Sequence, residues 1–142
     1  MYLFDTDHWT ILQLRNGQQY EALFAKMNEV GRGLCFTSIV TFHEVMNGWL
    51  KYIASPKSQK SVVNAYARFE ALLDAFSSSE LLPFSEKASE EFTRLRSNGC
   101  RIGLMDLRIA SIGLTHGMIV VTRNKVDFGR VPGLDLQDWI AS

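Results

Sequence analysis

The chain has 142 residues, a formal net charge of +0 at pH 7 and 46% hydrophobic residues. This length is typical of one domain with a single core, so residues 1–142 are expected to form one domain. No apolar run approaches the roughly 18–20 residues that a membrane span requires. The N-terminus lacks the basic segment that begins a signal peptide, which predicts a cytoplasmic location. The balanced charge argues against a generally basic nucleic-acid binder, so any contact with nucleic acid must use a local patch.

The chain begins with a short apolar run at residues 2–4, which predicts a buried strand that ends at Asp5. Thr6 or Asp7 is expected to cap a helix that continues to about residue 17. Further helices are predicted at about 18–31, 37–52, 58–76, 85–98 and 105–116. Further short strands are predicted at 34–36, 81–82 and 118–121, with a last apolar segment at 134–140. This alternation of strands and helices is typical of an α/β protein with a parallel sheet and helices on both faces.

The longest predicted helix, at 58–76, carries apolar side chains at helical spacing, which form one apolar stripe. Its members are Val62, Tyr66, Phe69, Leu72, Leu73 and Phe76. Basic residues gather in two later stretches. They are Arg94, Arg96, Arg101 and Arg108 in the first, and Arg123, Lys125 and Arg130 in the second.

Acidic and amide side chains follow or flank the predicted strands. They are Asp5, Asp7, Glu44, Asp106, Asn124 and Asp127. In open parallel sheets, ligands bind outside the carboxyl ends of the strands. Carboxylates gathered there repel one another, which raises their pKa values unless a cation intervenes. Carboxylate and amide oxygens suit Mg²⁺ or Mn²⁺, so the pattern favours metal-assisted phosphodiester hydrolysis. Taken singly, each residue also has a purely structural interpretation, such as a helix cap for Asp7.

Four motifs in this order resemble the PIN-domain family over essentially the full length of the chain. They are FDTD at 4–7, TSIVTFHE at 37–44, DLRIA at 106–110 and VTRNKVDF at 121–128. The tail at 131–139, with its final Asp-Trp pair, is similar to the end of the VapC-type toxins of VapBC toxin–antitoxin pairs. The resemblance implies a PIN-like domain with three α/β/α layers and a central, mainly parallel sheet of four to five strands.

The resemblance also implies roles for individual residues. Asp5, Glu44 and Asp106 match the acidic core of the family, which binds one or two Mg²⁺ or Mn²⁺ ions. Many members carry Asp at the position of Asn124, so this chain departs from the pattern there, and Asp127 is the nearest acid. The implied catalytic set is Asp5, Glu44, Asp106, Asn124 and Asp127, and the implied metal ligands are Asp5, Glu44, Asp106 and Asp127. The implied supporting residues are Thr6, Asp7 and Thr122.

The function that the resemblance implies is that of a metal-dependent endoribonuclease, the toxin of a type II toxin–antitoxin system. It would hydrolyse phosphodiester bonds of tRNA or another structured RNA through a Mg- or Mn-activated water, leaving 3′-OH and 5′-phosphate ends. The implied partners are the RNA substrate, a cognate VapB-type antitoxin and a second copy in a homodimer. The antitoxin tail is expected in a groove beside helices 18–31 and 39–52. Its candidate apolar contacts are Tyr20, Phe24, Phe42 and Trp49.

Two other hypotheses remain open at this stage. Asp5-Thr6-Asp7 also matches the D-x-D strand end of haloacid-dehalogenase-like phosphotransferases, in which Asp5 would be the nucleophile. Against it, the chain is short and no later Lys with a paired acidic motif is apparent. The second hypothesis is a PIN-like domain that has no catalytic activity and serves as a binding module.

The histidines suggest no further chemistry. His43-Glu44 lacks the second histidine of a zinc motif, since position 47 is Asn47. His8 and His116 are interpreted as structural or surface residues, because no triad pattern accompanies them.

Overall fold

The computed structural model describes residues 1–140 and contains a five-stranded parallel sheet. Its strands are β1 (Tyr2–Phe4), β2 (Cys35–Ser38), β3 (Leu81–Leu82), β4 (Ile119–Val121) and β5 (Leu136–Gln137). Their spatial order is β3-β2-β1-β4-β5. The prediction of an α/β fold with a mainly parallel sheet of four to five strands is confirmed.

Helices connect these strands along the chain. They are α1 (Thr6–Leu14), α2 (Gln18–Val30), α3 (Ile39–Ala54), α4 (Gln59–Ser77), α5 (Glu86–Ser97), α6 (Leu104–His116) and α7 (Lys125–Phe128). A short 3-10 turn, Arg32–Leu34, precedes β2. Ser38, Ser58 and Ser85 cap α3, α4 and α5 by accepting a backbone N–H three residues on. None of the helices among residues 1–140 is long and apolar enough to cross a membrane.

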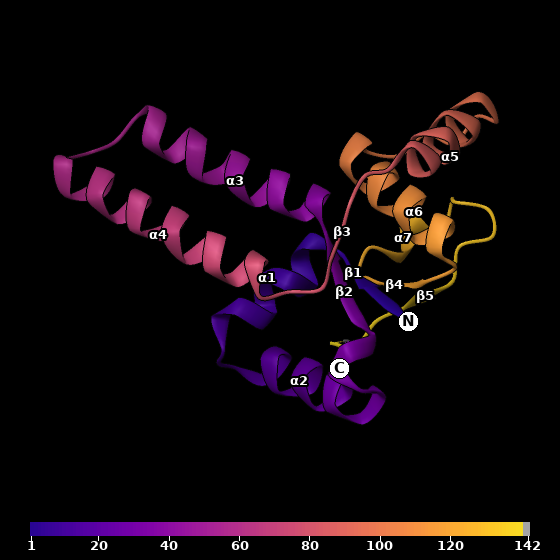
Figure 1. Ribbon diagram of the computed structural model, residues 1–142, viewed down its shortest axis with the longest axis horizontal. Coiled ribbons are helices and arrows are strands. Elements are labelled where there is room, and N and C mark those ends of the chain that lie inside the picture. The colour runs from indigo at the N-terminus through magenta and orange to yellow at the C-terminus, as the bar shows by residue number, and fades with distance from the viewer. Residues whose placement is uncertain (141–142) are drawn as a thin grey trace.

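Side chains of the central strands point alternately to two separate cores, as a pleated strand requires. Leu3 and Val120 belong to the core that contains residues of α5 and α6. Phe4 and Val121 belong to the core that contains residues of α1 and α2. The sheet therefore lies between two helical layers (Figure 1). At Gly113 an added Cβ would lie 2.9 Å from the Val120 side chain, so this glycine allows α6 to pack closely on β4.

Helices α3 and α4 form a long antiparallel pair that extends well beyond the sheet (Figure 1). The apolar stripe predicted on α4 is only partly buried. Phe76, at the end near the sheet, is buried and stacks on Trp9 with ring centroids 4.2 Å apart. Tyr66 and Leu73 are more than half exposed, at 56% and 58%, whereas Ala65 in the same helix is fully buried, because α3 packs against only one face of α4.

The strand order determines where a ligand site is expected. The chain places β2 and β3 on one side of β1, then returns to place β4 and β5 on the other. The order reverses between β1 and β4, and in open parallel sheets the crevice at such a reversal is the usual binding site. Asp5 follows β1, and Asn124 and Asp127 follow β4.

Candidate active site

Asp5 lies directly after β1 and is 5% exposed. Its Oδ1 accepts the backbone N–H of His8 at 2.9 Å, so Asp5 is the N-cap of α1. The expectation that Thr6 or Asp7 caps this helix is wrong, because α1 already begins at Thr6 and Asp5 is the residue before it. The cap bond holds the Asp5 side chain at the carboxyl end of the central strand.

Glu44, on α3, is brought to the same edge by a contact between residues distant in sequence. The Thr6 hydroxyl donates to Glu44 Oε1 at 2.6 Å. The same hydroxyl lies 3.2 Å from that of Thr41, which is buried on α3. Thr6 therefore links the start of α1 to α3 and orients the Glu44 carboxylate.

Asn124 lies between Asp106 and Asp127. Its Oδ1 accepts the backbone N–H of Asp127 at 3.3 Å, which directs the amide nitrogen toward the carboxylates. That nitrogen donates to Asp127 Oδ2 at 3.0 Å and to Asp106 Oδ2 at 3.4 Å. Buried Thr122 accepts the Asn124 N–H at 2.9 Å. Asn124 thus presents donors to the acidic residues, and an Asp at this position would present a further negative charge.

Asp106, in the first turn of α6, shows the electrostatic consequence of this grouping. Its pKa is raised from 3.8 to about 6, first by burial and then by the charges of Glu44, Asp5, Asp127 and Asp7. These carboxylates therefore lie near enough to Asp106 for their charges to disfavour its ionised form. Asp7 has the smallest effect of the four, and its side chain is exposed.

The chemistry of this cluster fits a hard divalent cation. The possible ligands are carboxylate and hydroxyl oxygens, which suit Mg²⁺ or Mn²⁺. The raised pKa of Asp106 reflects its burial first and then the surrounding negative charge, which such a cation would neutralise. Within residues 1–140, however, no group of three or more His, Cys, Asp or Glu side chains is arranged so that it could hold a metal ion. The residues therefore fit the ion in kind, without a complete set of ligands in place.

His8 also lies at this edge, and the sequence interpretation missed its side-chain contact with Asp5. It is fully buried, and its Nδ1 lies 3.1 Å from Asp5 Oδ1. The available signal was its spacing: the third residue after an N-cap places its N–H toward the cap side chain. The interpretation of His8 as structural or surface did not consider this contact.

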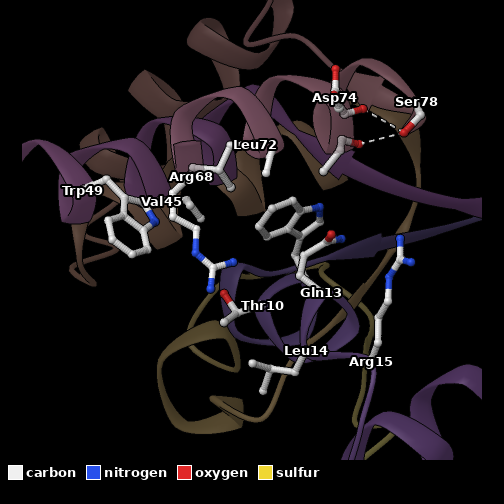
Figure 2. A pocket seen from close by; sticks show the side chains of 13 residues that line it. Thr10, Gln13, Leu14, Arg15, Val45, Trp49, Arg68, Leu72, Asp74 and Ser78 are labelled. Atoms are coloured by element: carbon white, nitrogen blue, oxygen red, sulfur yellow. Dashed lines mark hydrogen bonds between the residues drawn. The ribbon is translucent and has the colours of Figure 1, made fainter. Parts of the chain in front are cut away.

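Two pockets lie on either side of α1, and the acidic residues of the site line neither of them. The first, of about 610 Å³, is formed with α3 and α4 and includes Trp9, Trp49 and Leu72 in its lining. Figure 2 shows Arg68 pointing into this pocket from α4, toward Thr10. The second, of about 400 Å³, is formed with α2 and lined by Leu12, Gln13, Arg15, Tyr20, Phe24, Met27 and Arg32. Gln13 and Arg15 line both pockets, so the two adjoin at the end of α1.

The fold and site define an α/β domain with an acidic site at the carboxyl ends of its central parallel strands. The profile of the family described as PIN domain matches residues 2–134. The chain belongs to the PIN domain family.

Individual relatives agree with this assignment. The chain is 32% identical over 111 residues to Ribonuclease VapC2 of Rickettsia felis, covering 75% of this chain and 78% of the relative. It is 29% identical over 110 residues to the tRNA(fMet)-specific endonuclease VapC of Salmonella typhimurium, covering 75% of each. The crystal structure of VapBC2 from Rickettsia felis bound to a fragment of promoter DNA is similar to it. That likeness has a TM-score of 0.69 and 25% identity over 97% of this chain and 98% of the other.

Proposed function

We propose that the chain is a metal-dependent endoribonuclease and the toxin of a type II toxin–antitoxin system. The observation that carries the proposal is the convergence of Asp5, Glu44 and Asp106 at the sheet edge, with the pKa of Asp106 raised to about 6. Relatives named as VapC endonuclease and ribonuclease support the reaction class. The family match disfavours the haloacid-dehalogenase-like hypothesis.

Each residue has a distinct role in this proposal. Asp5, Glu44, Asp106 and Asp127 are the residues that would hold Mg²⁺ or Mn²⁺. When bound, such an ion lowers the pKa of water and stabilises charge on a phosphoryl group. Thr6 keeps the Glu44 carboxylate oriented through its 2.6 Å hydrogen bond. Asn124 holds Asp106 and Asp127 next to each other through its two N–H donors.

The substrate that we propose is a structured RNA, with tRNA favoured by the name of one relative. Since the chain has no net positive charge, the phosphate contacts must be local. Arg123, Lys125 and Arg130 are exposed on the segment that follows β4, which also carries Asn124 and Asp127. They are the basic side chains of this segment that would bind the RNA backbone beside the acidic cluster.

The partner that we propose is a VapB-type antitoxin, since the similar solved structure is a VapBC complex. The adjoining pockets on either side of α1 combine apolar walls with exposed Arg15, Arg32 and Arg68, which suits an apolar segment with acidic side chains. Trp49 lines the first pocket, and Tyr20 and Phe24 line the second. Phe42, predicted as a fourth contact, packs edge-on against Phe76 with ring centroids 5.0 Å apart.

RNA cleavage by the purified protein, freed of any antitoxin, tests the proposal. The reactions would contain Mn²⁺, Mg²⁺ or EDTA, and the ends would be mapped. The matched variants are Asp5→Asn, which keeps a helix-capping side chain, and Asp135→Asn at an exposed position. We expect discrete metal-dependent cuts with 5′-phosphate ends, lost in Asp5→Asn and kept in Asp135→Asn. Equal cleavage by Asp5→Asn, or cleavage unaffected by EDTA, would show that the proposal is wrong. Failure to bind Mn²⁺ at all would favour the inactive binding module.

A further inference from the structure

His8 occupies a position where an apolar side chain would be ordinary. It belongs to the inner face of α1, with Trp9 and Ile11, and its exposed fraction is 0%. Burying a polar ring costs free energy unless the ring is hydrogen-bonded. The polar contacts of His8 therefore explain why a histidine is tolerated there.

Both donors of His8 converge on one oxygen of Asp5. The backbone N–H and Nδ1 lie 2.9 Å and 3.1 Å from Asp5 Oδ1. An ionised carboxylate only accepts hydrogen bonds, so Nδ1 is the donor. Among residues 1–140, the hydrogen bonds to the Asp5 carboxylate all fall on Oδ1. The backbone bond alone is enough to cap α1, so the ring bond must have another effect, which is to fix the rotation of the carboxylate.

The C-terminal segment closes over the other side of the ring. Nε2 lies 3.7 Å from Asp138 Oδ1, which accepts the Ile140 N–H at 3.0 Å. Nε2 makes no hydrogen bond among the described residues, so the hydrogen bond of the ring is the one to Asp5. Trp139 packs edge-on against Phe4 with centroids 5.4 Å apart, which fixes this segment against the end of β1. The imidazole is thereby enclosed behind Asp5.

We propose that His8 is a positioning residue for Asp5: its ring occupies Oδ1 and leaves Oδ2 turned toward the acidic cluster as the oxygen for a divalent cation. This inference rests on the proposed function, because it assumes that Asp5 is a metal ligand. Partners that orient a metal ligand typically change metal affinity by about 10–100-fold when they are removed. His8 is therefore expected to affect metal affinity through orientation, although it would not touch the ion.

The test compares two amide substitutions. His8→Asn places an amide N–H near the position of Nδ1 and retains the bond to Asp5. His8→Gln places its amide near the position of Nε2 and loses that bond, while the site keeps a polar side chain. His116→Asn, at the exposed end of α6, is the matched control. Mn²⁺ affinity is measured without RNA by calorimetry, and the melting temperature in EDTA reports the fold.

We expect His8→Asn and His116→Asn to bind Mn²⁺ within about threefold of the wild type, and His8→Gln to bind it about 10–100-fold more weakly. Saturating Mn²⁺ should restore cleavage by His8→Gln, which loss of the fold would not allow. Equal Mn²⁺ affinities for His8→Asn and His8→Gln would overturn the inference while leaving the nuclease proposal intact. Absence of Mn²⁺ binding by the wild type would overturn both.

Discussion

Replacing Asp106 by Asn should stabilise the metal-free protein while it abolishes cleavage. The carboxylate of Asp106 is repelled by Glu44, Asp5, Asp127 and Asp7, and it is partly buried. The amide has nearly the same shape and can still accept the N–H of Asn124, which in the wild type lies 3.4 Å from Asp106 Oδ2. The substitution therefore removes a charge and keeps the local hydrogen bond.

The magnitude follows from the raised pKa of Asp106. One pKa unit is worth about 1.4 kcal/mol, so a rise from 3.8 to about 6 corresponds to ~3 kcal/mol. Because the side chain is only partly buried, solvent screening reduces this to on the order of 1–2 kcal/mol. Below pH 3.8 Asp106 is protonated in both the folded and the unfolded state, so its charge does not affect the free energy of unfolding. Between pH 3.8 and about 6 only the unfolded state ionises, so the wild type loses stability, and above about pH 6 the loss is complete.

Urea unfolding in EDTA at pH 4.5, 5.5, 6.5 and 7.5 measures this effect. The difference in unfolding free energy between Asp106→Asn and the wild type should grow with pH and level off above about pH 6–7. Asp135→Asn, which removes an exposed carboxylate, should show no such trend. Saturating Mn²⁺ should reverse the order, because bound metal stabilises the wild type by mass action. A difference that stays constant across this pH range would refute the electrostatic argument.

Three further substitutions test other parts of the site. Asn124→Asp replaces the donors to Asp106 and Asp127 with a charge, so the metal-free unfolding free energy should fall by about 1–3 kcal/mol in urea, while Mn²⁺ raises the melting temperature more than in the wild type. Glu44→Gln keeps an acceptor for Thr6, so the fold should persist while cleavage in Mn²⁺ falls by on the order of 100-fold or more. Trp49→Ala should weaken antitoxin binding by on the order of 30-fold, or ~2 kcal/mol, in calorimetry, and leave cleavage by the free protein unchanged.

Distinct results would contradict each expectation. An unchanged metal-free stability of Asn124→Asp would mean that its amide does not bridge the carboxylates. Full cleavage by Glu44→Gln would remove Glu44 from the metal ligands. For the pocket, Val63→Ala is the control, since Val63 is 66% exposed and outside the pocket lining. If Trp49→Ala and Val63→Ala bind antitoxin equally well, the pocket is not its docking site.

The structure changes what is expected of Asp5 and Asp106. From the sequence, both are acidic residues whose replacement by Ala should relieve repulsion and leave the metal-free fold at least as stable. In the structure, Asp5 also caps α1 and accepts the ring N–H of buried His8. Loss of a cap costs about 0.5–2 kcal/mol, so Asp5→Ala is expected to be destabilised, while Asp106→Asn is not.

Much of the architecture was predictable because it depends on local patterns. The apolar runs at 2–4 and 118–121 became β1 and β4 because β-branched and aromatic residues suit buried strands. Serines at 38, 58 and 85 cap their helices as residues of this type commonly do. How much of the apolar stripe of α4 is buried was not predictable, because helical periodicity does not show which face a neighbouring helix covers.

The sequence by itself determined the order of the elements, the family and the identity of the acidic residues, because these depend on residue type and spacing along the chain. Only the tertiary structure decided which atoms meet. It paired Thr6 with Glu44, turned the amide N–H groups of Asn124 toward the carboxylates and enclosed His8 behind Asp5. Such contacts depend on the distance and burial of groups far apart in the chain, and it is these two quantities that raise the pKa of Asp106.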